Sequence, residues 1–195
     1  MYKHKRFEDF AYVLDIFSPR HLSEYQNIVL GKDDLIVQLL GEQYFTLLEA
    51  AVSQKYKPLI GTKIYIGRDI PKSVLRVIRR IGYENLTQNA KNELETVVRK
   101  IVEESEARFI EFFNNSQPVT PRMHALELLP GIGKKIAMKI IEEREIQPFK
   151  SYEDLKKRVG LQDPVKAIVN RIIQELSNPD ERYFLFVRER YIPAR

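Results

Sequence analysis

The run from Leu129 to Ala137, which reads Leu-Pro-Gly-Ile-Gly-Lys-Lys-Ile-Ala, restricts the fold more than any other part of the chain. Its proline ends a preceding helix, and two glycines separated by one residue allow a tight turn. Lys134, Lys135 and the apolar residues after them suit the first turn of a new helix. We therefore expect two helices joined by a short turn, with Ile132 buried to hold the turn rigid.

This arrangement of helix, glycine turn and helix is expected twice between residues 120 and 176. The first unit begins at Thr120, an N-cap followed by Pro121 at the first helical position. The second begins with the capping spacing from Ser151 to Asp154, turns at Gly160–Asp163 and ends in a helix from Pro164 to about Leu176. Apolar positions correspond between the two units: Ile136, Ala137, Ile140 and Ile141 match Ile168, Val169, Ile172 and Ile173. Such a repeat forms its own small helical core.

The first turn resembles the helix-hairpin-helix motif of many DNA and RNA repair, replication and processing proteins. Backbone amides at the start of the second helix, the helix dipole and two lysines would attract a phosphate there. Such contacts hold a sugar-phosphate backbone without reading its sequence. The residues expected to bind are Gly131, Ile132, Gly133, Lys134 and Lys135. The resemblance also implies a monovalent cation at the carbonyls of Leu129 and Gly131.

The second turn departs from the same pattern. Gly160 is present, but Gln162 and Asp163 stand where a second glycine and a lysine would favour phosphate. Because Asp163 would repel an anion, we expect this turn to serve packing.

Residues 1–82 contain short β-rich runs separated by turn residues, which predicts a small β-barrel. The segment 74–81 suits a helix or a closing strand equally. In a barrel of the OB type, exposed aromatic and basic residues would bind nucleic acid. The candidates are Tyr44, Phe45, Tyr56, Lys57, Lys63, Tyr65 and Arg68. A sharper basic cluster, Arg76, Arg79 and Arg80, could follow a phosphate backbone or be solvated charges that pair with the acidic long helix.

The middle of the chain, residues 83–119, predicts one long connecting helix. Thr87 is its expected N-cap, and an apolar stripe at helical spacing continues to Asn115. We expect four parts: an OB-like barrel over 1–82, this helix over 83–119, a doubled helix-hairpin-helix domain over 120–180, and a tail over 181–195. The aromatic and β-branched run Tyr183–Val187 in the tail predicts a strand. The fold class is therefore α+β.

Composition excludes several functions. The chain has no cysteine, which excludes disulfides and thiolate metal sites, and its three histidines show no ligand spacing. Its net charge of +5 is unevenly distributed: residues 1–82 and 120–195 each carry +4, and residues 83–119 carry −3. Two basic ends suit a polyanionic partner. Without a signal peptide or an apolar span, the chain is expected in the cytoplasm, with no membrane partner and no cofactor.

Most of the chain is similar to an uncharacterised archaeal family of predicted RNA-binding proteins, which has an OB-like N-terminal part and a helix-hairpin-helix module. The resemblance extends over Ala11–Asp15, Glu42–Glu49, Tyr65–Gly67, Leu86–Asn114, His124–Lys135, Phe149–Val159 and Tyr183–Arg188. It implies RNA rather than DNA as the partner.

Two alternatives to non-catalytic binding remain open. A DNA glycosylase or lyase would attack the sugar with Lys135, assisted by Glu153 or Asp154, although the surrounding motifs of those enzymes are missing. A protein-interaction scaffold would use the aromatic stripe Phe109, Phe112 and Phe113. The oligomeric state is not predicted.

Overall fold

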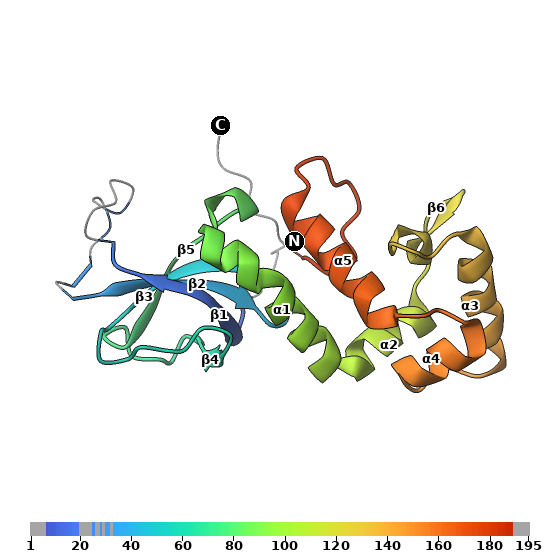
Figure 1. Ribbon diagram of the computed structural model, residues 1–195, viewed down its shortest axis with the longest axis horizontal. Coiled ribbons are helices and arrows are strands. Elements are labelled where there is room, and N and C mark those ends of the chain that lie inside the picture. The colour runs from blue at the N-terminus through green and yellow to red at the C-terminus, as the bar shows by residue number, and fades with distance from the viewer. Residues whose placement is uncertain (1–6, 20–24, 26–27, 29, 32, 189–195) are drawn as a thin grey trace, which may run out of the picture. The chain divides into compact units, whose positions relative to one another are not determined.

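Figure 1 shows the computed structural model, which describes residues 7–19, 25, 28, 30–31 and 33–188. These residues form both strands and helices, so the mixed α+β class is confirmed. The chain divides into two compact units. We call Met1–Val97 together with Phe186–Arg195 the N-terminal unit, and Val98–Leu185 the C-terminal unit.

The N-terminal unit contains a five-stranded antiparallel sheet with the order β4-β1-β2-β3-β5. The strands are β1 (Phe10–Phe17), β2 (Leu35–Gly41), β3 (Leu47–Val52), β4 (Lys63–Tyr65) and β5 (Leu75–Arg80). The ambiguous segment 74–81 is thus a strand, and it pairs with β3.

The expected barrel does not close within the described residues. β4 and β5 form the two edges of the sheet and do not pair with each other. β4 is three residues long, and the chain between it and β5 folds back on itself in turns. The Ile70 amide donates to the Gly67 carbonyl and the Val74 amide to the Pro71 carbonyl, so these groups are not available for a ladder.

One face of the sheet carries the apolar core of this unit, because alternate residues of a strand point to the same side. Its buried members are Ala11, Val13, Val37, Leu39, Leu48, Ala50, Val52, Ile64, Ile66 and Leu75. The other face carries buried polar residues, among them Gln38 and Glu49, each 1% exposed. Buried polar groups need hydrogen-bond partners, and Gln38 finds them next to the helix that follows the sheet.

That helix, α1 (Gln88–Glu104), follows the short 3-10 turn η2 (Tyr83–Asn85) and begins where the sequence predicts. The Thr87 hydroxyl accepts the Ala90 amide at 3.0 Å and donates to the Asp15 carboxylate at 2.5 Å. The Thr87 amide donates to the Gln38 side chain at 2.9 Å. The N-cap therefore starts the helix and also ties it to β1 and β2.

The expected single long helix is wrong, because it is interrupted at Ser105 and resumes as α2 (Glu106–Asn115). In a continuous helix the Val102 carbonyl would accept the Glu106 amide. Here this carbonyl accepts the Tyr152 hydroxyl at 2.9 Å, and the Glu106 carboxylate accepts the Tyr152 amide at 2.6 Å. A distant residue thus takes part in hydrogen bonds where the helix changes direction.

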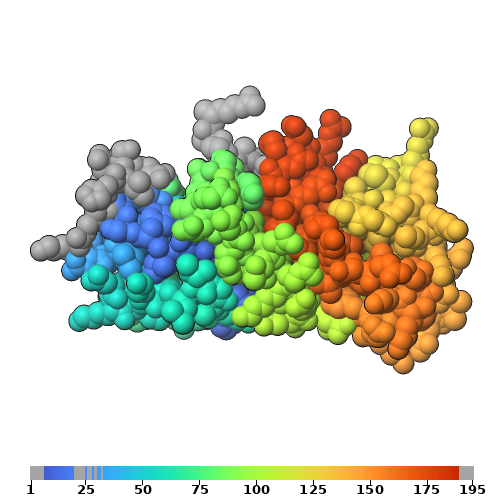
Figure 2. All heavy atoms as spheres, in the orientation of Figure 1, coloured from blue at the N-terminus to red at the C-terminus, as the bar shows by residue number. Residues whose placement is uncertain are grey.

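The C-terminal unit continues with a small hairpin and a series of short helices. Its elements are β6 (Pro118–Thr120), β7 (Met123–His124), the 3-10 helix η3 (Ala125–Leu128), α3 (Lys134–Ile146), α4 (Tyr152–Val159) and α5 (Pro164–Ser177). α3 packs against α2 and α4, and α4 against α5. The β6–β7 hairpin projects from this unit in Figures 1 and 2.

The predicted helix start at Thr120 and Pro121 is wrong. Thr120 ends β6 and pairs with Met123, so the proline lies in a hairpin turn. The N-cap of the first leg is His124, whose Nδ1 accepts the Leu126 amide at 3.1 Å. The first leg is therefore one turn of 3-10 helix, whereas α3, α4 and α5 begin as predicted.

The predicted strand at Tyr183–Val187 is also wrong, because the described tail has no regular structure. Side chains of α5 take its backbone groups: the buried Arg171 donates to the Tyr183 carbonyl, and Glu175 accepts the Leu185 amide. Beyond Leu185 the tail belongs to the N-terminal unit, where the Arg188 amide donates to the Tyr44 carbonyl at 3.3 Å.

Candidate functional site

The turn between η3 and α3 has the local geometry that its sequence requires. Gly131 has φ of +88°, a conformation that side chains other than glycine rarely adopt. Ile132 is 3% exposed and Leu129 is 1% exposed, so apolar side chains on both sides of the glycine are buried in the unit. The turn is therefore held in place from inside.

The outer side of this turn is open. Gly131 and Gly133 are exposed, and a Cβ atom on either one would have no protein atom within 4 Å. Gly133 is the N-cap of α3, and no side chain caps the helix. The first amides of a helix have no partner within it, so those of α3 are accessible to an anion from outside.

Lys134 and Lys135 occupy the first two positions of α3, and both are exposed. Within the described part of the chain, neither ammonium group forms an ion pair with a carboxylate. The structure therefore brings together all five residues predicted for this site: Gly131, Ile132, Gly133, Lys134 and Lys135.

The carbonyls suggested for a monovalent cation lie in the same turn. The Leu129 carbonyl accepts the Ile132 amide at 3.0 Å, which leaves one of its two lone pairs for another partner. A cation at Leu129 and Gly131 stays a prediction.

The turn between α4 and α5 begins in a similar way and ends differently. Gly160 has φ of +80° and is followed by the buried Leu161. At the start of α5, however, the Asp163 carboxylate accepts the Lys166 amide at 2.8 Å, and Pro164 has no amide hydrogen. The helix end that an anion would approach is thus occupied by the protein's own carboxylate.

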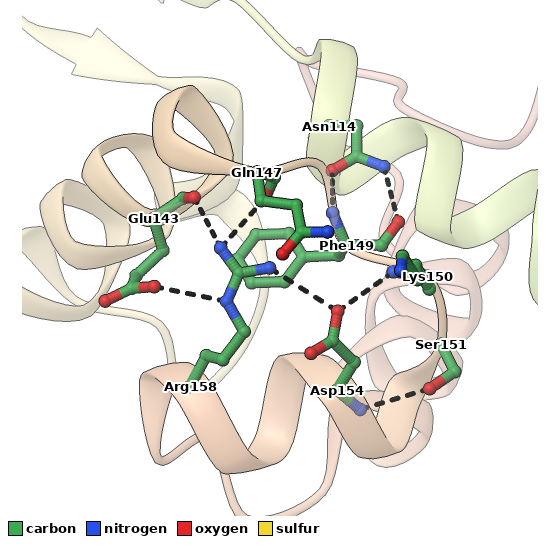
Figure 3. Close-up of polar contacts among 8 residues, drawn as sticks. All are labelled: Asn114, Glu143, Gln147, Phe149, Lys150, Ser151, Asp154 and Arg158. Carbon is green, nitrogen blue, oxygen red and sulfur yellow. Dashed lines mark hydrogen bonds and ion pairs between the residues drawn. The ribbon is translucent and has the colours of Figure 1, made fainter.

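A polar network holds the far end of α3 (Figure 3). The guanidinium of Arg158, on α4, donates to the carbonyls of Glu143 and Gln147, and its Nε donates to the Glu143 carboxylate at 3.1 Å. The same group lies 4.5 Å from the centre of the Phe149 ring. Asn114 completes the network by exchanging two hydrogen bonds with the Phe149 backbone, at 2.9 and 2.8 Å. Arg158 is therefore a structural residue that joins α4 to the C-terminal end of α3.

The basic residues predicted in the N-terminal unit do not all share one role. Arg79 pairs with the buried Glu49 at 2.7 Å, and Glu49 also accepts from Tyr25 and Gln38. Partial burial lowers the pKa of Arg79, but its hydrogen bond and charge pairing with Glu49 outweigh this and raise the pKa above its ordinary value. Arg79 thus compensates a buried carboxylate. Lys63, on β4, pairs with Glu42 at 2.6 Å.

A cavity of about 840 Å³ brings several of these cations together in the N-terminal unit. Its lining includes the predicted residues Arg68, Arg76, Arg79 and Arg80, but not Lys63. It also includes Lys72 and Phe7, which the sequence interpretation missed. Both lie outside the regular strands, where no periodicity marks a binding position.

Two other features, a metal-ligand cluster and a membrane-spanning helix, are absent from the described residues. The described residues contain no group of three or more His, Cys, Asp or Glu side chains placed to hold a metal ion. In the described ranges, no helix combines the length and the apolar character needed to cross a bilayer.

Comparison with known proteins places the chain in a family. A family model described as a protein of unknown function, DUF655, matches residues 7–188. The uncharacterized protein MJ0038 of Methanocaldococcus jannaschii is 41% identical over 187 residues, which cover 95% of this chain and 82% of that protein. The crystal structure of Af1531 from Archaeoglobus fulgidus shares 43% identity with a TM-score of 0.79, and the match covers 93% of this chain and 100% of that one. The expected membership of an uncharacterised family with archaeal relatives is thus confirmed, and this chain belongs to the DUF655 family.

Proposed function

We propose that the protein binds nucleic acid, without catalysis of its own, through the turn from Gly131 to Lys135. The single observation that carries this proposal is the open N-terminus of α3. Two exposed glycines, uncapped helix amides and two exposed lysines lie together there, and among the described residues no acidic side chain pairs with the lysines. Amides and a helix dipole at such an end favour an anion.

The partner suited to this site is a sugar-phosphate backbone. The site offers amide hydrogens and the charges of two lysines, which suit phosphate oxygens, so it would bind many sequences alike. In this proposal the segment from η3 to α5 is a doubled helix-hairpin-helix module with a degenerate second turn, and the N-terminal unit is an open OB-like sheet. RNA is favoured over DNA by the family resemblance of the sequence.

A lyase is the weaker alternative because its expected acids are engaged elsewhere. Asp154 accepts the Lys150 amide at 3.1 Å and pairs with Arg158 at 3.4 Å. Glu153 pairs with Lys157 at 3.6 Å on the surface of α4. Trapping a Schiff base between Lys135 and an abasic site with borohydride would establish the lyase; we expect no trapped product.

A protein-interaction scaffold built on the aromatic stripe of α2 is also the weaker alternative. Phe109 and Phe113 are 0% exposed and belong to the interior of the C-terminal unit. Their burial serves folding, so they are not presented to a partner.

A double charge reversal tests the proposed function directly. We expect Lys134→Glu combined with Lys135→Glu to weaken binding of a duplex or single-stranded RNA by well over tenfold, because two cations at the phosphate contact become anions. The matched control is Lys156→Glu with Lys157→Glu, which makes the same charge change at exposed positions of α4. Fluorescence anisotropy at two salt concentrations gives the affinity and its salt dependence. Equal losses in the two variants would reject the site and leave only a general charge effect.

A further inference from the structure

Three aromatic rings lie partly exposed at one edge of the N-terminal unit. Phe7 is 43% exposed, Phe10 is 41% exposed and Tyr65 is 38% exposed. Phe10 and Tyr65 are opposite each other on the paired strands β1 and β4, and their ring centroids are 5.3 Å apart in an edge-to-face arrangement. β4 belongs to the teal segment at the surface of this unit in Figure 2. We call these three rings, with the cations described next, the aromatic-basic edge.

Cationic side chains lie over two of the rings. The Arg68 guanidinium is 3.7 Å from the centre of the Phe7 ring, and the Lys63 ammonium is 4.7 Å from the centre of the Phe10 ring. A cation over a ring face is attracted by the negative potential of that face. This combination of exposed rings and cations is typical of surfaces that bind single-stranded nucleic acid.

The cavity described above adjoins this edge, because Phe7 and Tyr65 are part of its lining. Its cationic lining residues are Arg68, Lys72, Arg76, Arg79 and Arg80, and its acidic ones are Glu8, Asp9 and Asp69.

Two of the three acidic side chains already accept hydrogen bonds from other groups of the protein. The Glu8 carboxylate is 7% exposed and accepts the amides of Gln43 and Tyr44, each at 2.9 Å. Asp69 accepts the Tyr65 hydroxyl. Even without Arg79, whose charge Glu49 balances, four cationic side chains line the cavity against three acidic ones, so it presents more positive than negative charge to a ligand.

We propose that the aromatic-basic edge binds an unpaired stretch of nucleic acid, with bases against Phe10 and Tyr65 and a phosphate in the cavity near Arg68 and Lys72. The strand is unpaired because a ring can stack only on a base face that no neighbouring base covers. The choice of nucleic acid as the polyanion rests on the proposed function, but the residues belong to the other unit of the chain. The natural target then includes a single-stranded part.

Two other polyanions would use the same cations without the rings. An acidic protein segment, or a phosphate polymer without bases, gains nothing from stacking. The discriminating measurement is therefore the difference between a ligand with bases and the same ligand without them.

The experiment uses the full chain and two labelled oligomers of equal charge, an oligouridylate of about eight nucleotides and an abasic oligomer of the same length. We expect the double variant Phe10→Ala with Tyr65→Ala to bind the oligouridylate about tenfold or more weakly, and the abasic oligomer as tightly as the unmodified chain does. Tyr65→Phe, which keeps the ring, and Phe184→Ala, which removes an exposed ring from the C-terminal unit, are controls expected to bind both oligomers normally. Equal weakening of both oligomers, or no weakening of the oligouridylate, overturns the proposal.

A second pair of variants guards against loss of folding. Phe10→Leu with Tyr65→Leu keeps apolar volume and removes the aromatic faces, so it is expected to reproduce the selective loss of oligouridylate binding while thermal unfolding stays unchanged.

The cations of the edge are tested separately. Arg68→Ala with Lys72→Ala is expected to weaken binding of both oligomers and to flatten its salt dependence, since fewer counterions are displaced. Lys55→Ala, a change at an exposed residue outside the cavity lining, is its control.

The same oligomers separate this inference from the proposed function. If Lys134→Glu with Lys135→Glu leaves all binding intact while the ring variants lose the oligouridylate, the proposed function fails and the aromatic-basic edge stands. If the turn variant loses binding and the ring variants do not, the edge fails and the proposed function stands.

Discussion

The turn before α3 and the turn before α5 share a backbone conformation and differ in the charge at the start of the following helix. Each contains a glycine with positive φ, Gly131 at +88° and Gly160 at +80°. Each places a buried apolar residue after that glycine, Ile132 at 3% and Leu161 at 7% exposure. The difference lies at the N-cap, which is Gly133 before α3 and Asp163 before α5.

Because of this difference, two turns of similar backbone conformation present different chemistry at the start of the following helix. A carboxylate at the N-cap satisfies a helix amide and complements the dipole, so the helix end is stable and closed to anions. A glycine at the same place leaves the amides to solvent or to a ligand. The first turn therefore lacks the stability that a capping side chain would add to α3. Two lysines lie at that end of the helix.

The largest expected effect concerns the buried apolar residue that follows the glycine in both turns. Ile132→Ala removes a buried side chain and is expected to lower the free energy of unfolding by about 2–5 kcal/mol, because a cavity remains. Leu161→Ala should have an effect of the same size, since it makes the equivalent contact. Chemical denaturation measures both. A loss under about 1 kcal/mol for Ile132→Ala would show that the first turn is not held from inside.

The next prediction concerns a substitution that gives the first turn the kind of N-cap found in the second. Gly133→Asp introduces a capping carboxylate at a position with an extended backbone and open space, so the stability should not fall. Binding of RNA is expected to weaken more than tenfold, because the carboxylate occupies the place proposed for phosphate. Gly133→Asn, a neutral cap, is the matched control and should weaken binding less. Unchanged affinity in Gly133→Asp would remove the distinction between the turns.

The reverse change tests the second turn. Asp163→Ala is expected to lower the free energy of unfolding by about 1 kcal/mol, the usual effect of losing an N-cap, and to leave RNA affinity unchanged. Asp163→Asn keeps the hydrogen-bond acceptor and should retain most of the stability. Binding gained or lost in Asp163→Ala would mean that this turn also meets the ligand.

The smallest effect is a pH dependence in the leg before the first turn. Burial, together with the charge of Arg144, lowers the pKa of His124 below its ordinary value, and Nδ1 must be unprotonated to accept the Leu126 amide. The folded state therefore favours the neutral ring, and its contribution to stability is lost as the pH falls through and below about 6.5. Melting temperatures at pH 7.5 and 5.5 should differ more for the natural chain than for His124→Asn, which keeps an N-cap. Equal differences would exclude His124 as the cause.

Most of the C-terminal unit could be predicted because its signals are local. Ser151 caps α4 and Pro164 opens α5 through contacts within a few residues, and both starts are where the sequence places them. The glycine turn could be predicted because its signal is also local. The start at Thr120 failed because Thr120 pairs with Met123 in the hairpin, so the first leg begins at His124 instead.

The N-terminal unit was less predictable, and its candidate site shows why. Arg79 and Lys72 look alike as exposed cations in a sequence, but Arg79 pairs with a buried carboxylate thirty positions away. Phe10 begins a strand whose next residues are buried, so its own exposure is visible only when the edge partner, β4, is in place.

The sequence by itself determined the helix starts at residues 88, 134, 152 and 164 and the glycine turn, because capping and backbone freedom act over a few residues. Only the tertiary structure decided where the middle helix breaks, that the sheet stays open within the described residues, and that Tyr183–Val187 is not a strand. Each of these depends on which distant side chain or strand takes a backbone hydrogen-bonding group, as Tyr152 does at Val102 and Arg171 at Tyr183.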